Sequence, residues 1–345
     1  MKKIFILLSF LVLISAAGLF IATARENNIK DNFRVAFVDA SVKYRARVVE
    51  RFYDSLGAKG ILEVLEAEYP RCHFEAHELG KIVYKKTQDL TTSVELCEAR
   101  CTGGCFHGAL IEAFKDIVIL PDSPQSHIGL TDLKNKMRAI CSDETVAALH
   151  REGKCIHGVG HALAFLSEYV LEEAISYCKL LNDKPLEHYC AEGVFMEYIF
   201  RNNIPGIKKD SLHYPCDRYT EFPAACYRSQ TQKIREELRE LDKIGNECLK
   251  LKSLGRLGCF YGMGFAYSQE VIKEPHFLSS LCQYGEINDK RMCIEGAMEK
   301  PEKAGLSAAV EACNYVSDEL RSFCVTAFHN KSYSLEKSFE LYFKQ

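Results

Sequence analysis

Hydrophobic residues recur along the chain at spacings that place them on one face of an α-helix. Three such runs lie between residues 105 and 200: Ala109, Ile111 and Phe114; Leu163, Phe165 and Val170; Val194, Tyr198 and Ile199. Residues 233–248 show a similar but more highly charged pattern. The alternation expected of strands is nearly absent, and the nine prolines fall between the predicted helices. The pattern therefore predicts an all-α fold.

The sixteen cysteines divide this helical pattern into repeats. From Cys141 onward, short gaps of 10–14 residues alternate with long gaps of 20–26 residues. One cysteine of each unit opens the motif Cys-x-x-Gly, at Cys105, Cys155, Cys190, Cys259 and Cys293. Cys226 and Cys324 occupy the same repeat position but are not followed by the glycine of the motif. Residues 72–80 form a variant first copy of the motif. A period near 34 residues predicts about eight helical hairpins in an α/α solenoid, with a closed α/α toroid as the alternative.

The same register predicts disulfides between the end of one hairpin and the start of the next. Six pairs follow from the short gaps: Cys141–Cys155, Cys178–Cys190, Cys216–Cys226, Cys248–Cys259, Cys282–Cys293 and Cys313–Cys324. By register Cys97 pairs with Cys105, which leaves Cys72 for Cys101. The alternative is a thiolate zinc site at Cys101 and Cys105 with His107 nearby.

The N-terminal segment predicts export from the cytoplasm. Two lysines precede an uncharged apolar run over residues 4–22, and Ala22-Thr23-Ala24 offers a cleavage site. We therefore interpret residues 1–24 as a secretory signal peptide or, alternatively, an uncleaved membrane anchor. Either places the rest of the chain outside the cytoplasm, in contact with the membrane only through this segment, where paired cysteines are the default. Residues 25–58 are predicted as a helical cap or stalk, and residues 59–345 as the repeat domain.

Composition excludes one class of partner. The formal net charge is −3 and there is no run of lysine or arginine, so the sequence predicts no nucleic-acid partner. The chain also lacks Gly-x-Ser-x-Gly, His-Glu-x-x-His and Cys-x-x-Cys-His motifs. Glycines recur at the start of the predicted helices, where glycine is costly, and this indicates close helix–helix approach.

The cysteine-stapled hairpins resemble those of cysteine-rich exported members of the Sel1-like, tetratricopeptide-type family. The resemblance covers roughly residues 72–330 and is architectural, because the Cys-to-Cys gap is mostly longer here and the family's Ala/Gly-rich consensus is not visible. It implies an α/α solenoid that binds a protein or peptide. The His-Gly turns are also similar to those of α/α toroids such as lanthionine cyclases, but the zinc-ligand pattern of that family does not map onto this chain.

Histidines carry the only chemical signal in the sequence. Two pairs lie four residues apart, His73/His77 and His157/His161, so each pair shares one helical face and can share a metal ion. Aligning His77 with His161 puts His73 in the same repeat position as His107 and His157. A third ligand could come from His107, Glu78 or Glu192. Imidazole suits Zn, Cu or Fe. The spacing is consistent with two separate sites or with one site formed by one histidine pair and His107.

Two functions are consistent with these features. The first is an exported scaffold that binds a protein or peptide on the face formed by the first helices, with a His-bound metal. The alternative is a metalloenzyme of the cell envelope, a hydrolase or oxidoreductase, whose histidines hold a catalytic metal. A structural role for the histidines, as helix caps or in a polar inner face, is the alternative to metal binding.

Overall fold

The structure is a computed structural model that describes residues 23–69, 72–98, 100–117, 130–149, 152–200, 211–299 and 310–329. Every regular element in these ranges is a helix, and they contain no strand. This confirms the all-α class. The predicted signal peptide or anchor over residues 1–24 lies almost entirely outside the described residues.

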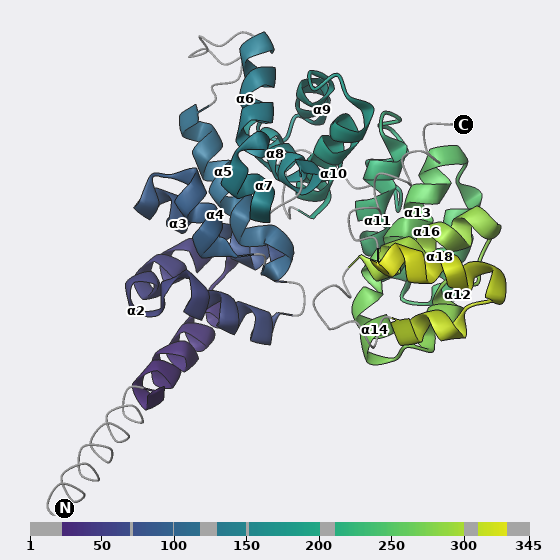
Figure 1. Cartoon of the computed structure of the whole chain (residues 1–345), viewed down its shortest axis with the longest axis horizontal. Coiled ribbons are helices and arrows are strands. Elements are labelled where there is room, and N and C mark those ends of the chain that lie inside the picture. Colours follow the sequence, from purple (N-terminus) through teal and green to yellow (C-terminus); the bar gives the residue numbers. More distant parts are fainter. Residues whose placement is uncertain are drawn as a thin grey trace, which may run out of the picture. The chain divides into compact units, whose positions relative to one another are not determined.

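The chain divides into two compact units (Figure 1). Unit 1 contains the described residues 23–69, 72–98, 100–117 and 142–149, and unit 2 contains residues 130–141, 152–200, 211–299 and 310–329. The sequence predicts one repeat domain over residues 59–345, and the division into units falls inside that range.

Unit 1 is built around two helices that pack directly on each other, α3 (His73–Thr87) and α5 (Gly104–Ile117). The helix α4 (Leu90–Cys97) packs on both, and α7 (Glu144–Leu149) packs on α4. The helix α2 (Val42–Glu68) packs on α3 and contains a non-helical residue at Gly57, so it continues past the expected end of the cap at residue 58. Residues 23–39 form a helix whose Phe33 and Phe37 are fully buried.

Unit 2 repeats the packing of α3 on α5 several times. Each first helix packs on the next in chain order, and Figure 1 shows α11, α13 and α16 side by side. The series is α8 (Glu152–Leu166), α10 (Lys184–Phe200), α11 (Pro223–Leu238), α13 (Ser253–Ala266), α16 (Ile287–Met298) and α18 (Asp318–His329). The other elements of the unit are α6 (Leu130–Ser142), α9 (Leu171–Lys179), α12 (Leu241–Lys250), α14 (Ser268–Lys273), α15 (Phe277–Leu281) and the 3₁₀ turn Cys313–Tyr315.

At four crossings, neighbouring first helices approach so closely that glycine is required. A Cβ added at Gly108 of α5 would lie 2.1 Å from the carbonyl oxygen of His77 in α3. At Gly193 of α10 it would lie 1.9 Å from the carbonyl oxygen of His157 in α8. The same contact recurs between Gly262 and the carbonyl of Arg228, at 2.6 Å, and between Gly296 and the carbonyl of Tyr261, at 2.0 Å. The recurring glycines thus serve close helix packing, as their position in the sequence indicates.

These contacts correct the alignment of the first repeat. The carbonyl that faces a glycine belongs to His77 in α3 and to His157 in α8, so these two residues share one repeat position. The expected alignment of His77 with His161 is therefore wrong by one helical turn, and His73 lies one turn before the shared position. The first copy is hard to align because it lacks the Cys-x-x-Gly motif, with Glu75 where the others have cysteine.

All sixteen cysteines are paired, and the eight disulfides join the residues that the spacing predicts. They are Cys72–Cys101, Cys97–Cys105, Cys141–Cys155, Cys178–Cys190, Cys216–Cys226, Cys248–Cys259, Cys282–Cys293 and Cys313–Cys324. The thiolate zinc site at Cys101 and Cys105 is therefore wrong, because both sulfurs are in disulfides. Eight disulfides indicate an oxidising, extracytoplasmic environment.

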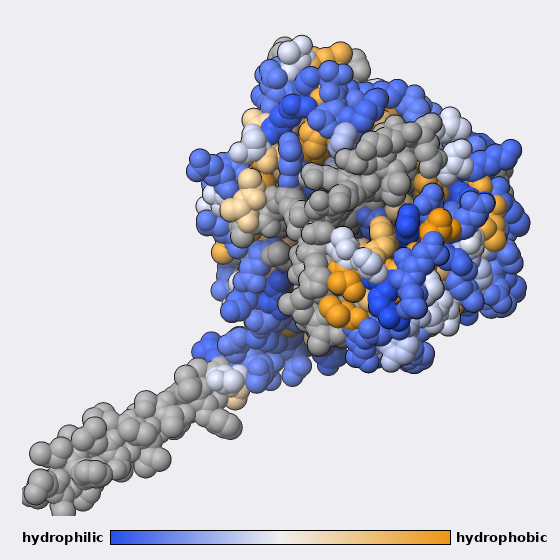
Figure 2. Space-filling view, turned by 45° about the vertical axis from the view of Figure 1, so that its right-hand side comes forward, coloured by the Kyte–Doolittle hydropathy of each residue, from blue (hydrophilic) through white to orange (hydrophobic). Residues whose placement is uncertain are grey.

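The face of the described residues that Figure 2 shows is predominantly hydrophilic, with hydrophobic residues in small groups. Within the described ranges, no helix combines the length and apolar character that crossing a bilayer requires.

Candidate metal centre

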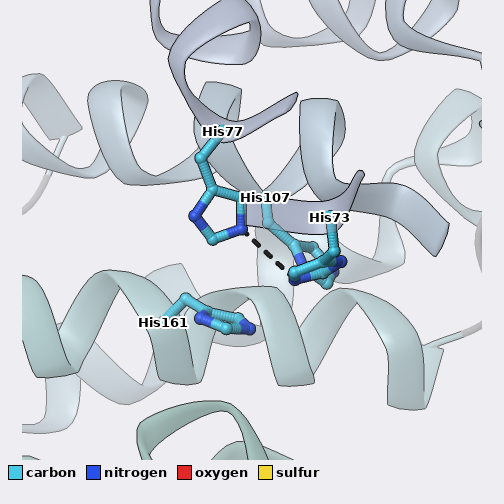
Figure 3. Close-up of side chains that lie close together, drawn as sticks. All are labelled: His73, His77, His107 and His161. Atoms are coloured by element: carbon cyan, nitrogen blue, oxygen red, sulfur yellow. Dashed lines mark hydrogen bonds between the residues drawn. The ribbon is translucent and has the colours of Figure 1, made fainter. Parts of the chain in front are cut away.

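Three histidines of unit 1 bring their ring nitrogens together, as Figure 3 shows. The Nε2 atom of His73 lies 3.2 Å from Nε2 of His77 and 3.4 Å from Nδ1 of His107. His77 and His107 are each only 4% exposed, and His73 is partly buried. His73, His77 and His107 are hereafter the histidine trio.

The trio forms because α3 and α5 cross at the histidines themselves. His73 and His77 lie one turn apart on α3, so both side chains point from the same face. Gly104 and Gly108 of α5 lie against the carbonyls of His73 and His77, where an added Cβ would come within 2.0 and 2.1 Å. Without side chains at these two positions, α5 comes close enough for His107 to reach the pair.

The spacing of the trio matches the requirements of a transition metal. Tetrahedral ligands about 2.0–2.1 Å from a metal ion hold their nitrogens about 3.3 Å apart. The two measured nitrogen–nitrogen distances, 3.2 and 3.4 Å, agree with that value. The trio can therefore supply three neutral nitrogen ligands and leave a fourth position for water or another donor.

An unusual turn lies beside the trio. Cys101, Thr102 and Gly103 have φ values of 48°, 52° and 81°, a left-handed conformation that is unfavourable for a β-branched threonine. The disulfides Cys72–Cys101 and Cys97–Cys105 fix this turn from both sides. It places Thr102 Oγ1 3.3 Å from Nδ1 of His73, where it can orient the imidazole.

Unit 2 contains a different arrangement around the second pair of histidines. On α8, Nε2 of His157 and Nε2 of His161 are 3.2 Å apart, and His161 is fully buried. The other ring nitrogen of each faces a carboxylate: His161 Nδ1 lies 2.9 Å from Glu197, and His157 Nδ1 lies 3.7 Å from Glu192. Burial lowers the pKa of His161 well below its usual value, and the charges of His157 and Arg228 act in the same direction. Its ring is therefore neutral near pH 7.

Glu192 is the centre of a buried charge network in unit 2. Its carboxylate also lies 3.3 Å from Nε2 of His188 and 3.5 Å from Nε of Arg228. Burial by itself would raise the pKa of Glu192. The charge of Arg228 and hydrogen bonds from His157 and His188 outweigh that effect and hold this pKa well below its usual range.

The network continues through Arg228 to the next helices. The Arg228 guanidinium donates to both oxygens of Glu299, at 2.7 and 2.9 Å, and the Tyr261 hydroxyl donates to the same carboxylate at 2.8 Å. Burial disfavours the charged guanidinium, but the nearby carboxylates of Glu192 and Glu299 raise the pKa of Arg228 above its usual value. These groups form a line of alternating charge across successive helices of unit 2.

The other predicted ligands have different roles. Glu78 accepts a hydrogen bond from Lys81, at 2.8 Å, and is not among the residues that cluster with the trio. Glu66, Cys72 and Cys101 also lie close together, but both cysteines are in one disulfide and Glu66 accepts from Arg100 and from the Cys101 amide. This group is a structural contact and not a metal site.

Two contacts, His188 with Glu192 and Thr102 with His73, are not predicted from the sequence. The spacing of His188 and Glu192, one helical turn apart on α10, could have indicated that they meet. Thr102 has no such signal, because only the left-handed turn brings it to His73.

No family model matches this chain, and neither a curated protein nor a solved structure shows a similarity to it.

Proposed function

We propose that this protein is an exported helical scaffold that binds a transition-metal ion through His73, His77 and His107. The observation that carries the proposal is that ring nitrogens of His77 and His107 both lie near Nε2 of His73, at distances that suit neighbouring ligands of one tetrahedral ion. Ordinary polar packing of histidines does not require three rings to share one point.

The ligand set favours Zn²⁺ or Cu²⁺ over iron. Imidazole binds both of these ions well, whereas non-haem iron sites commonly add a carboxylate to two histidines. Among the described residues, the cluster to which the trio belongs holds histidines alone. When bound, the metal supplies a positively charged centre with an open position for a donor atom.

The test is a metal measurement on the full chain with its disulfides intact. The trio variant carries His73→Ala, His77→Ala and His107→Ala. The control variant carries His213→Ala and His276→Ala, two histidines outside both arrangements. After loading with Zn²⁺ and desalting, elemental analysis of the trio variant is expected to show one equivalent less than the unchanged chain and the control variant. Equal zinc content in all three would contradict the proposal.

A second candidate function follows from the open position. Catalytic zinc sites keep three protein ligands and a water, whose pKa falls to about 7 on the metal. The trio would then hold a water-activating ion of a hydrolase. Zinc-dependent hydrolysis of a chromogenic ester, lost in the trio variant and retained in the control variant, would support this candidate. Metal binding without such activity would favour the scaffold.

We also propose that the first helices of unit 2 form a solenoid of the Sel1-like kind. The packing of each first helix on the next in chain order supports this architecture. The protein or peptide ligand that such a surface would bind stays a prediction, as does the choice between a cleaved signal and a membrane anchor.

A further inference from the structure

The pair His157/His161 in unit 2 brings two ring nitrogens together inside the protein. Two Nε2 atoms face each other at 3.2 Å inside the protein, where His157 is 8% exposed and His161 is fully buried. A hydrogen bond at this distance needs a proton on one Nε2 atom and a lone pair on the other.

The carboxylate behind His161 fixes the tautomer of that ring. Glu197 lies 2.9 Å from Nδ1 of His161, and a carboxylate can only accept, so that Nδ1 carries the proton. The neutral His161 ring therefore presents the lone pair of its Nε2 atom to Nε2 of His157. Glu192 lies 3.7 Å from Nδ1 of His157, on the side of the ring away from His161. A metal ion in place of the shared proton would be bound by both Nε2 atoms.

The same features are those of a metal ligand pair with its supporting groups. Histidine ligands usually bind through one ring nitrogen while the other donates to a carboxylate, which fixes the tautomer and strengthens the ligand. The Nε2–Nε2 distance of 3.2 Å also equals the one between His73 and His77 in unit 1. Both pairs are thus set at the spacing of neighbouring ligands on one ion.

We propose that His157 and His161 bind a second transition-metal ion, with Glu197 and Glu192 as positioning residues. Every group in the proposal belongs to unit 2. Two imidazoles leave the remaining positions to water or an external donor. Cu²⁺ is the ion of choice for the test, because it binds nitrogen ligands most tightly among the divalent first-row metals.

The test uses Cu²⁺ alone as the probe and the trio variant as the starting protein, so that binding at the trio does not contribute. Calorimetric titration is expected to show one equivalent of Cu²⁺ in the trio variant. Adding His157→Ala and His161→Ala, the pair substitutions, is expected to remove it, whereas adding the control substitutions leaves it. Nitrogen hyperfine structure in the electron paramagnetic resonance spectrum should disappear with the pair. A trio variant that takes up no Cu²⁺, or whose Cu²⁺ survives loss of the pair, would overturn the proposal.

A reciprocal experiment does not require the trio variant, so it remains valid if that variant folds poorly. The pair substitutions in the otherwise unchanged chain are expected to lower the Cu²⁺ content from two equivalents to one. An unchanged content overturns the second site and leaves the trio intact. If only the trio fails to bind, the unchanged chain takes up one equivalent of Cu²⁺. The trio variant keeps this equivalent, and the pair substitutions remove it.

Glu197 offers a separate test of the positioning role. Glu197→Gln is expected to weaken Cu²⁺ binding about 10- to 100-fold, the usual effect of losing such a supporting group. Glu197→Asp should restore part of the affinity and the original resonance spectrum. If Glu197 were merely structural, the substitution would lower the thermal stability of the metal-free chain and leave the affinity of the folded protein unchanged.

Discussion

The two units contain similar histidine pairs in different chemical surroundings. In unit 1 the pair meets a third imidazole, His107, and a threonine hydroxyl lies behind His73. In unit 2 the pair is backed by the carboxylates of Glu197 and Glu192. One arrangement collects neutral nitrogen donors, and the other pairs nitrogen donors with negative charge.

The difference originates in the repeat register. The residue whose carbonyl faces a glycine is His77 in α3 and His157 in α8. The second histidine lies one turn before this position in α3 and one turn after it in α8. The next helix then presents His107 in unit 1 and Glu192 in unit 2 at the corresponding position. The two arrangements thus differ by a one-turn shift of the second histidine and by one residue of the next helix, His107 or Glu192. These two differences give a three-nitrogen cluster in unit 1 and a charge network in unit 2.

The largest expected effects come from disulfides that differ in loop length between the units. Cys72–Cys101 closes 29 residues in unit 1, and Cys216–Cys226 closes 10 residues in unit 2. By the loop-entropy model they stabilise the protein by about 4 and about 3 kcal/mol. Replacing each pair by serines should therefore cost about 1 kcal/mol more in unit 1, measured by urea unfolding. Equal losses would show that loop length does not set the contribution of these bridges.

Glycine substitution at the helix crossings is expected to have the next largest effect. Gly108→Ala and Gly193→Ala each force a Cβ onto a histidine carbonyl, so we expect a loss of about 1–3 kcal/mol in the free energy of unfolding. Gly108→Ala should also weaken metal binding at the trio. Gly255→Ala is the matched control, because its Cβ would meet side chains and no backbone, the Tyr227 ring at 3.3 Å and Pro223 Cβ at 3.9 Å. A control as destabilised as the two crossing variants would contradict the role of the crossings.

A smaller effect is expected at the threonine that supports the trio. Thr102→Ala removes the hydroxyl beside His73, and we expect at least a tenfold loss of Zn²⁺ affinity, about 1.4 kcal/mol. Thr102→Ser keeps the hydroxyl and should bind nearly as well. Thr102→Gly relieves the left-handed strain and should weaken zinc binding while raising thermal stability. If all three variants bound zinc equally, the turn would serve the fold only.

The smallest effect concerns an exposed helix cap in unit 1. Hydrogen bonding by the Thr92 side chain, and then by the Thr92 amide, which donates to Asp89 at 2.7 Å, holds the pKa of Asp89 below its usual value. Asp89→Ala should cost about 1 kcal/mol at pH 7. Because the folded-state pKa is depressed, the stabilisation due to charge is complete above the unfolded value of about 3.9 and is lost as the pH falls below it. The difference between the unchanged chain and Asp89→Ala should therefore shrink on acidification, whereas Asp89→Asn should show little pH dependence.

Much of the fold could be predicted because its constraints recur in the sequence. The disulfide pairs follow from cysteines that occupy the same two repeat positions, and the close helix packing follows from Gly108, Gly193 and their counterparts. The position of His77 was predicted wrongly because the first copy lacks both residues of the Cys-x-x-Gly motif. Only the carbonyl–glycine contact defines its register.

The site could be predicted only in part, for a different reason. Spacing along one helix brings His73 to His77 and His157 to His161, and helical geometry alone determines these pairs. Whether a third group joins depends on how far the next helix is rotated and how closely it approaches. Thr102 reaches His73 through a turn held by two disulfides, and no local pattern encodes that conformation.

The glycine contacts have a consequence for how such a protein diversifies. Where a glycine lies at the crossing, backbone meets backbone, so the close approach of the two helices does not depend on the side chain one residue before the glycine. That position holds His107, Glu192, Tyr261 and Glu295 in different repeats, while the close approach is retained. A repeat that keeps the glycine can therefore exchange an acid, a base or a ligand at this position without repacking its neighbours.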